Sequence, residues 1–170
     1  MEKVIFTISG LRGIFGKTLT PELVMDFSRS FGSYLKGKKV AISRDTRFSG
    51  PILFHAVATG LLGSGSCVYD FGVCPTPAIV MMTKKLGYDG GIQITASHNP
   101  EVWNGLKFIS GKGRFLYPNE LKEFKKHIHK ENKKRIINVK PNIFKKEIIT
   151  PYIKNIVSSI YFNKINNTER

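Results

Sequence analysis

A serine, a histidine and an asparagine follow one another in a short segment that favours a strand and then a turn. The segment is Thr95-Ala96-Ser97-His98-Asn99-Pro100. It places a small hydroxyl nucleophile beside a potential proton carrier, and the proline restricts its own φ and the residue before it, which favours a turn. The apolar residues 90–95 predict a buried strand. We therefore expect Ser97 at the carboxyl end of that strand, where open α/β sheets have their ligand crevices.

A lysine lies close enough along the chain to join this segment. Eleven residues span Ser97 to Lys107, and Asn104-Gly105 between them is a dipeptide that can turn the chain back on itself. A hydroxyl, an imidazole and an ammonium could then share one small volume, which suits phosphate chemistry. We do not expect His98 to be the direct base for Ser97, because adjacent side chains in extended backbone point to opposite faces. A supporting role is predicted for it.

Arginines stand at two other points that are predicted to be loops. Arg12 lies between Gly10 and Gly13, so that the backbone there can bend tightly and direct the guanidinium. Arg44 and Arg47 follow a predicted strand and flank Asp45. For these two arginines, phosphate contact and an internal ion pair with the aspartate both remain open.

Strand and helix patterns alternate through most of the chain. Helices are predicted at residues 20–36, 51–62, 77–86, 118–130 and 150–162. Strands are predicted at residues 3–8, 39–43, 67–71 and 90–95, with an antiparallel hairpin from 106–109 and 114–116. The first helix begins at Thr20-Pro21-Glu22, which combines a capping threonine with proline in the first turn. The order predicts an α/β fold, a three-layer α/β/α sandwich with a mixed, mostly parallel sheet.

Composition and charge narrow the classes of partner. Of the net charge of +15, residues 1–111 contribute +5 and residues 112–170 contribute +10, so most of the excess lies away from the segments above. No aromatic residues are interleaved there as in a stacking platform, so specific nucleic-acid binding is not expected. No apolar run reaches the roughly 18–20 residues of a membrane span. Cys67 and Cys74 have no metal-site spacing, and reduced thiols in a cytoplasmic protein are expected.

Three segments together resemble one enzyme family. Ser97-His98-Asn99-Pro100 with Trp103-Asn104-Gly105-Leu106-Lys107 is similar to the active-site loop of the α-D-phosphohexomutases, which include phosphoglucomutase, phosphomannomutase and phosphoglucosamine mutase. Ser9-Gly10-Leu11-Arg12-Gly13 resembles their N-terminal arginine loop, although many members carry an acidic residue where this chain has Ser9-Gly10. Arg44-Asp45-Thr46-Arg47 with Ser49-Gly50 resembles their second loop. The resemblance covers about residues 3–130 and corresponds to the first of four family domains.

The resemblance implies a role for each candidate residue. Ser97 would carry the phosphoryl group given to a hexose 1- or 6-phosphate, through a bisphosphorylated sugar intermediate. Lys107 would contact the phosphoserine region and transfer protons, and Arg12 would bind phosphate. Phosphate-binding or loop-holding roles would fall to the remaining candidates, which are Arg44, Arg47, His98 and Asn99.

The resemblance also implies partners that lie outside this sequence. Mg²⁺ would be held through the phosphate on Ser97 and by an Asp-Gly-Asp-type loop of a second domain, which is not found here. A hexose 1,6-bisphosphate would be the activator, a hexose phosphate the substrate, and domains II to IV the remaining partners. We expect residues 1–130 to form domain I, 131–149 a linker or edge segment, and 150–170 an interdomain helix with the start of domain II. Such a piece, whether excised or naturally truncated, is expected to have negligible mutase activity by itself.

Two alternatives from other classes stay open. The first is a noncatalytic phosphosugar-binding or regulatory module. The second is a polyanion-binding protein that uses the basic residues 131–170. The sequence does not choose among glucose, mannose and glucosamine phosphates.

Overall fold

The computed structural model describes residues 4–36, 38–128 and 142–167. The strands are β1 (Ile5–Thr7), β2 (Gly10–Ile14), β3 (Lys39–Arg44), β4 (Cys67–Val73), β5 (Gly90–Ile94), β6 (Trp103–Ser110), β7 (Arg114–Phe115) and β8 (Ile143–Lys145). The helices are α1 (Pro21–Tyr34), α2 (Gly50–Gly63), α3 (Thr76–Lys85), α4 (Pro118–Ile128) and α5 (Ile149–Asn167). No helix within these described ranges is long and apolar enough to cross a membrane.

The strands form one mixed sheet with the order β1-β2-β6-β5-β3-β4-β8, and β7 pairs with β6. The half from β5 through β3 and β4 to β8 is parallel. The other half, in which β1, β2, β5, β6 and β7 meet, is antiparallel. The α/β fold with a mixed sheet is therefore confirmed, and the sheet is partly rather than mostly parallel, because β2 adds an antiparallel strand that the sequence did not predict.

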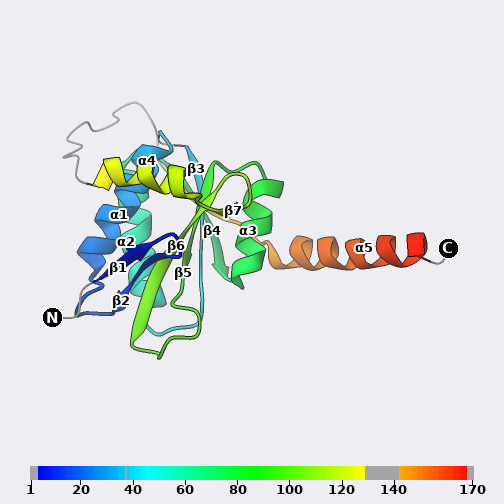
Figure 1. The fold of residues 1–170 in the computed structure, drawn as a ribbon, viewed down its shortest axis with the longest axis horizontal. Coiled ribbons are helices and arrows are strands. Elements are labelled where there is room, and N and C mark those ends of the chain that lie inside the picture. The colour runs from blue at the N-terminus through cyan, green and yellow to red at the C-terminus, as the bar shows by residue number, and fades with distance from the viewer. Residues whose placement is uncertain (1–3, 37, 129–141, 168–170) are drawn as a thin grey trace.

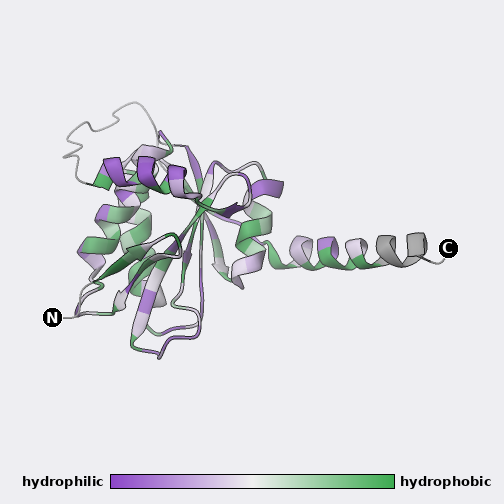
Figure 2. Ribbon diagram, in the orientation of Figure 1, coloured by the Kyte–Doolittle hydropathy of each residue, from purple (hydrophilic) through white to green (hydrophobic). Residues whose placement is uncertain are grey.

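Helices cover both faces of the sheet, which gives three layers (Figure 1). Successive side chains along a strand point to opposite faces of the sheet, so the core consists of two clusters, one on each face, as β5 and β6 show. Ile92 and Phe108 are register partners in the cluster with α1, α2 and α4. Ile109 lies on the opposite face in the cluster with α3. In Figure 2, α2 is mainly hydrophobic and α4 mainly hydrophilic, as expected because α2 packs against both α1 and the sheet, while α4 packs mainly against α1.

Local sequence signals explain the helix boundaries. Thr20 caps α1 by accepting a hydrogen bond from the backbone N–H of Leu23 at 3.3 Å, and proline opens the helix. Proline also stands in the first turn of α2 and α3. Helix α5 runs from Ile149 to Asn167, beyond the expected end at residue 162, and extends away from the rest of the structure (Figure 1).

Two segments that were expected to be loops or turns are strands. Arg12 lies in β2, paired with Gly105 of β6, rather than in a flexible loop. Asn104 and Gly105 lie inside β6 and make no turn. The chain reverses earlier, within residues 95–102, and Asn104 is buried with its side-chain amide hydrogen-bonded to Ser49 and Gly105.

The segment after α4 is described only in part. Residues 129–141, which include the end of the expected helix 118–130 and the first part of the expected linker 131–149, lie outside the described residues. Ile143–Lys145 form β8, a short exposed strand at the edge of the sheet that pairs in parallel with β4.

Candidate functional site

Two loops meet at the carboxyl ends of neighbouring parallel strands. Arg44 and Ile94 are register partners at the last positions of β3 and β5. The loop after β3 begins with Asp45, whose N–H donates to the carbonyl of Ile94 at 3.0 Å. Because parallel strands end at the same edge, residues 45–49 and 95–102 are brought side by side.

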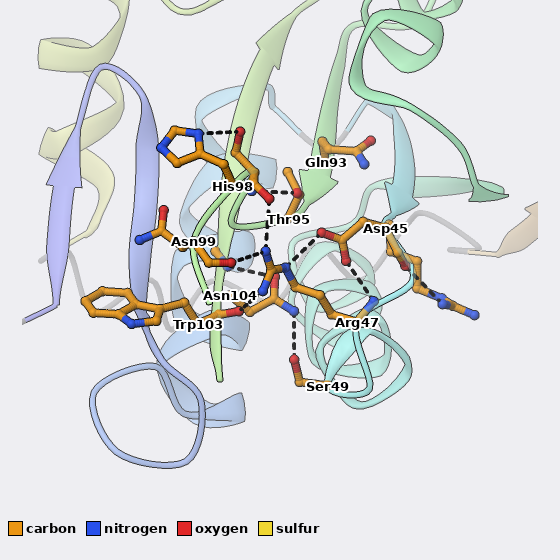
Figure 3. A network of polar contacts seen from close by, with 12 residues as sticks. Asp45, Arg47, Ser49, Gln93, Thr95, His98, Asn99, Trp103 and Asn104 are labelled. Atoms are coloured by element: carbon orange, nitrogen blue, oxygen red, sulfur yellow. Dashed lines mark hydrogen bonds and ion pairs between the residues drawn. The ribbon is translucent and has the colours of Figure 1, made fainter. Parts of the chain in front are cut away.

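Ser97 lies at the exposed end of this arrangement in an uncommon conformation. Its φ is +59°, in the left-handed region that residues other than glycine seldom adopt. Its Oγ lies 3.5 Å from Nδ1 of His98 (Figure 3). The expectation that the two side chains point to opposite faces was wrong, because it assumed extended backbone at Ser97.

An open recess of about 440 Å³ surrounds the serine. Its lining residues are Asp45, Thr46, Arg47, Ser97, Asn99 and Glu101. They come from the two crossing loops, and most of them are polar. The recess is therefore suited to a polar or charged ligand, with the hydroxyl of Ser97 at its wall.

Arg12 reaches this loop from β2. Its Nη1 donates to Oδ1 of Asn99 at 2.9 Å. The pairing of β2 with β6 places Arg12 opposite Gly105, where the absence of a side chain lets the two backbones approach: a Cβ at Gly105 would lie 2.2 Å from the carbonyl oxygen of Leu11. The structure thus brings Arg12 into contact with Asn99, two residues after Ser97.

The guanidinium of Arg47 makes all of its hydrogen bonds within the protein. Its Nε donates to Asp45 Oδ2 at 3.1 Å, and its four terminal N–H groups are directed at carbonyl oxygens of the serine loop (Figure 3). The carbonyl acceptors are Pro100 at 2.8 Å, Trp103 at 3.1 Å, Ser97 at 3.0 Å and Asn99 at 2.7 Å. A guanidinium has five N–H donors, so all of them are engaged. This geometry corresponds to the internal ion pair and opposes the predicted phosphate contact.

Arg44 lies at the other side of the same turn. Its Nη1 donates to the carbonyl of Asp45 at 3.2 Å. Its side chain passes over Gly50, where an added Cβ would lie 3.2 Å from Cδ. Phosphate binding by Arg44 stays a prediction.

Lys107 faces a second recess of about 420 Å³. The residues around it are Ile8, Ser9, Lys107, Arg114, Phe115, Leu116 and Tyr117. The ammonium lies 5.3 Å from the centre of the Phe115 ring. Burial, and then the nearby positive charge of Arg12, lower the pKa of Lys107 from the usual lysine value. Lys107 is therefore coupled to Arg12 but lines a different recess from Ser97.

Hydrogen bonds of buried polar side chains stabilise the two loops and the strands before them, and the sequence did not reveal these bonds. Asn104 donates from Nδ2 to Oγ of Ser49 at 2.8 Å, and both residues are fully buried. Ser43 is hydrogen-bonded to Gln93 on the neighbouring strand. Thr95 accepts the N–H of Ser97 through Oγ1 at 3.0 Å. Only the hydrogen bond to Thr95 could have been predicted from the sequence, since a threonine two residues before a turn residue often accepts that residue's backbone N–H.

Comparison with known proteins gives one consistent result. A family model described as phosphoglucomutase/phosphomannomutase, alpha/beta/alpha domain I, matches residues 3–135. The chain is 47% identical over 110 residues to the phosphoglucosamine/phosphogalactosamine mutase of Sulfurisphaera tokodaii, covering 64% of this chain and 24% of that protein. It is 35% identical over 159 residues to the phosphoglucosamine mutase of Prochlorococcus marinus, covering 92% and 35%.

A solved structure has the same fold. The phosphoglucomutase/phosphomannomutase family protein of Burkholderia thailandensis aligns with a TM-score of 0.75 and 29% identity, over 91% of this chain and 36% of that one. The chain spans about a quarter to a third of the length of the curated relatives named above.

Proposed function

Because the chain belongs to the phosphoglucomutase/phosphomannomutase family, in which it corresponds to the alpha/beta/alpha domain I, we propose that Ser97 carries the phosphoryl group of a phosphohexomutase. The observation that carries the proposal is the exposed Ser97 hydroxyl at the carboxyl ends of β3 and β5, beside an imidazole. The complete reaction would interconvert hexose 1-phosphate and hexose 6-phosphate through a bisphosphorylated sugar.

The transfer step needs a nucleophile and an acceptor for its proton. Oγ of Ser97 attacks a phosphorus of the hexose bisphosphate, an Oγ–P bond forms, and the bond from phosphorus to the sugar oxygen breaks. The serine proton leaves to a base and the sugar oxygen is protonated, so that the products are a phosphoserine and a hexose monophosphate. Nδ1 of His98, 3.5 Å from Oγ, is positioned to accept that proton when it is unprotonated.

The product needs positive charge nearby. A phosphoserine carries about −1.5 to −2 charges at neutral pH, and catalysis of phosphoryl transfer is mostly positioning and electrostatic stabilisation. Arg12 reaches the serine loop through Asn99, and Lys107 is coupled to Arg12.

The family implies a magnesium-dependent enzyme. Among residues 4–36, 38–128 and 142–167, no group of three or more His, Cys, Asp or Glu side chains could hold a metal ion. Both oxygens of Asp45, in the Ser97 recess, accept bonds from Arg47. A phosphate on Ser97 would offer oxygen ligands of the kind Mg²⁺ prefers. The described residues by themselves do not make a magnesium site.

The family also implies hexose phosphate substrates, and the choice of sugar is open to experiment. The relatives compared above are named for glucosamine, galactosamine, glucose and mannose phosphates. We propose that the remaining domains of a complete enzyme are the partners of this one. A cytoplasmic location, and the absence of nucleic-acid and membrane partners, stay predictions.

Phosphorylation of the chain tests the proposal. The chain is incubated with glucosamine 1,6-bisphosphate or glucose 1,6-bisphosphate and analysed by peptide mass spectrometry. We expect one phosphate, located on Ser97 and lost in Ser97→Ala. The matched control Ser159→Ala removes an exposed serine of α5 and should label as the parent does. Labelling at other positions, or none at all, would contradict the proposal.

The same samples separate the noncatalytic alternative. Binding of the bisphosphate in calorimetry without phosphate on Ser97 would favour a phosphosugar-binding module. A coupled assay with hexose 1-phosphate, Mg²⁺ and the bisphosphate checks the prediction that this chain has negligible turnover by itself. Sustained turnover would refute that prediction without affecting the role of Ser97.

A further inference from the structure

The backbone of Ser97 has a conformation that nothing in its local sequence requires. The other described residue with positive φ that is not glycine is Lys36, at φ +59° just after α1, where helices commonly end in the left-handed region. Ser97 follows a strand instead and has no helix end to account for its φ. Such a conformation persists where surrounding structure holds it.

The N–H of Ser97 is held by the side chain of Thr95. Oγ1 of Thr95 accepts that N–H at 3.0 Å, and Thr95 itself is buried and fixed at the end of β5 by its N–H, which donates to the carbonyl of Gly105 at 2.9 Å. The amide of Ser97 is thus satisfied by a side chain from two residues earlier rather than by a neighbouring strand.

The carbonyl of Ser97 is held by Arg47. Nη2 of Arg47 donates to it at 3.0 Å, and the same guanidinium spans the loop to the carbonyl of Trp103. Asp45 holds the arginine in place, because its two carboxylate oxygens accept hydrogen bonds from Nε–H and from the backbone N–H of Arg47, both at 3.1 Å. The arginine side chain is only 11% exposed, so it is enclosed by the groups it binds.

We infer that Thr95 and Arg47 are positioning residues that hold Ser97 in the left-handed conformation from both sides, and so turn its hydroxyl toward His98 and the open recess. In extended backbone the side chains at 97 and 98 would point to opposite faces. With φ at +59° they approach to 3.5 Å. The inference rests on the proposed function only for its consequence, which is the presentation of Ser97 for phosphoryl transfer.

The backbone conformation can be measured without any substrate. In the isotopically labelled chain, the HN–Hα coupling and the Cα shift of Ser97 report its φ, and amide hydrogen exchange reports its N–H. We expect Thr95→Val, which keeps the side-chain shape, and Arg47→Gln each to move the φ-sensitive signals out of the left-handed range. Exchange at the Ser97 amide should accelerate by about tenfold or more, the size expected when a hydrogen bond of this kind is lost.

Two controls separate positioning from general loss of structure. Thr95→Ser retains the hydroxyl and should restore the parent signals of Ser97. Arg29→Gln removes an arginine of an exposed ion pair with Asp26 and should leave the loop unchanged. Unchanged exchange at Ile92 in the core will show that each variant is folded. Left-handed signals that persist in both Thr95→Val and Arg47→Gln, or that change equally in Arg29→Gln, would overturn the inference.

The rate at which Ser97 is phosphorylated is a second measurement, and it separates the positioning role from the proposed function. With a hexose 1,6-bisphosphate as donor, Arg47→Gln and Thr95→Val should slow labelling of Ser97 at saturation by about tenfold or more, with the half-saturating concentration unchanged, because no donor of Arg47 is available to a phosphate. A raised half-saturating concentration for Arg47→Gln would make it a ligand instead. If the parent chain is never labelled, the proposed function fails, while the coupling and exchange still decide the positioning role.

Discussion

Removing the amide of Asn104 should destabilise the protein more than any change of an exposed asparagine. Its Nδ2 donates to Ser49 Oγ, and its Oδ1 accepts the N–H of Gly105, both at 2.8 Å. Asn104→Ala loses both bonds and leaves the Gly105 N–H buried without that acceptor. With about 0.5–1.5 kcal/mol for each of the two bonds and about 1–3 kcal/mol for a buried unpaired group, we expect a loss of about 2–6 kcal/mol in the free energy of unfolding.

Urea unfolding followed by circular dichroism measures this loss. Asn119→Ala is the matched control, because Asn119 is exposed in the first turn of α4, and changes at such positions usually stay within about 0.5 kcal/mol. Because domains usually have a total stability of about 5–15 kcal/mol, Asn104→Ala stays folded at 25 °C wherever the parent stability exceeds this loss. The slope with urea should not change.

A double-mutant cycle tests whether the hydrogen bond between Asn104 and Ser49 accounts for the loss of stability. Ser49→Ala removes the acceptor of Asn104, so the combined variant should lose less than the sum of the single losses, by about 1 kcal/mol. Additive losses would mean that the two side chains do not act on each other. A loss for Asn104→Ala no greater than that of Asn119→Ala would refute the reasoning that buried polar ties hold the loops.

Three further predictions concern close packing and pH. Gly105→Ala should unfold at markedly lower urea, because its Cβ would lie 2.2 Å from the backbone oxygen of Leu11, and a wild-type midpoint would contradict this. The pKa of Lys107 is lowered by burial, so unfolding takes up a proton and stability rises with pH as the usual lysine range is approached; Lys107→Met should flatten that alkaline rise. The hydrogen bond from Arg114 lowers the pKa of Glu120. The stabilisation of the fold by this bond is therefore fully present above the usual glutamate pKa and is lost as the pH falls below it. Glu120→Gln should reduce the acid-side slope of thermal stability.

The elements with strong local signals could be predicted from the sequence. Helix α1 begins at Pro21 as its capping threonine and proline indicate, and the buried strand before the serine ends at Ile94. Both features depend on neighbours in the chain. Strand β2 could not be found in this way, because its glycines favour a loop and one of its two pairing partners, β6, lies about 90 residues further along the sequence.

Asn104 and Gly105 show how tertiary contacts override a strong local signal. Asn-Gly is a typical hairpin dipeptide, yet here both residues lie in β6. The asparagine amide is more favourably placed inside, where Ser49 accepts from it, and the glycine permits the close approach of β2. These contacts join loops separated by more than fifty residues, and a single sequence contains no information on which loops meet.

The same limit applies to the charge at the site, because the sequence does not show which arginines bond within the protein. Arg12, Arg44, Arg47 and Lys107 suggested four cations for one phosphate. Arg47 uses all five donors inside the protein, and its charge is balanced by Asp45. The candidate cations that remain are then Arg12, which contacts Asn99 of the serine loop, and Arg44 beside the turn, while Lys107 lines a different recess. A phosphoserine would carry about −1.5 to −2 charges, and among these cations Arg12 is the one whose side chain contacts the serine loop, through Asn99.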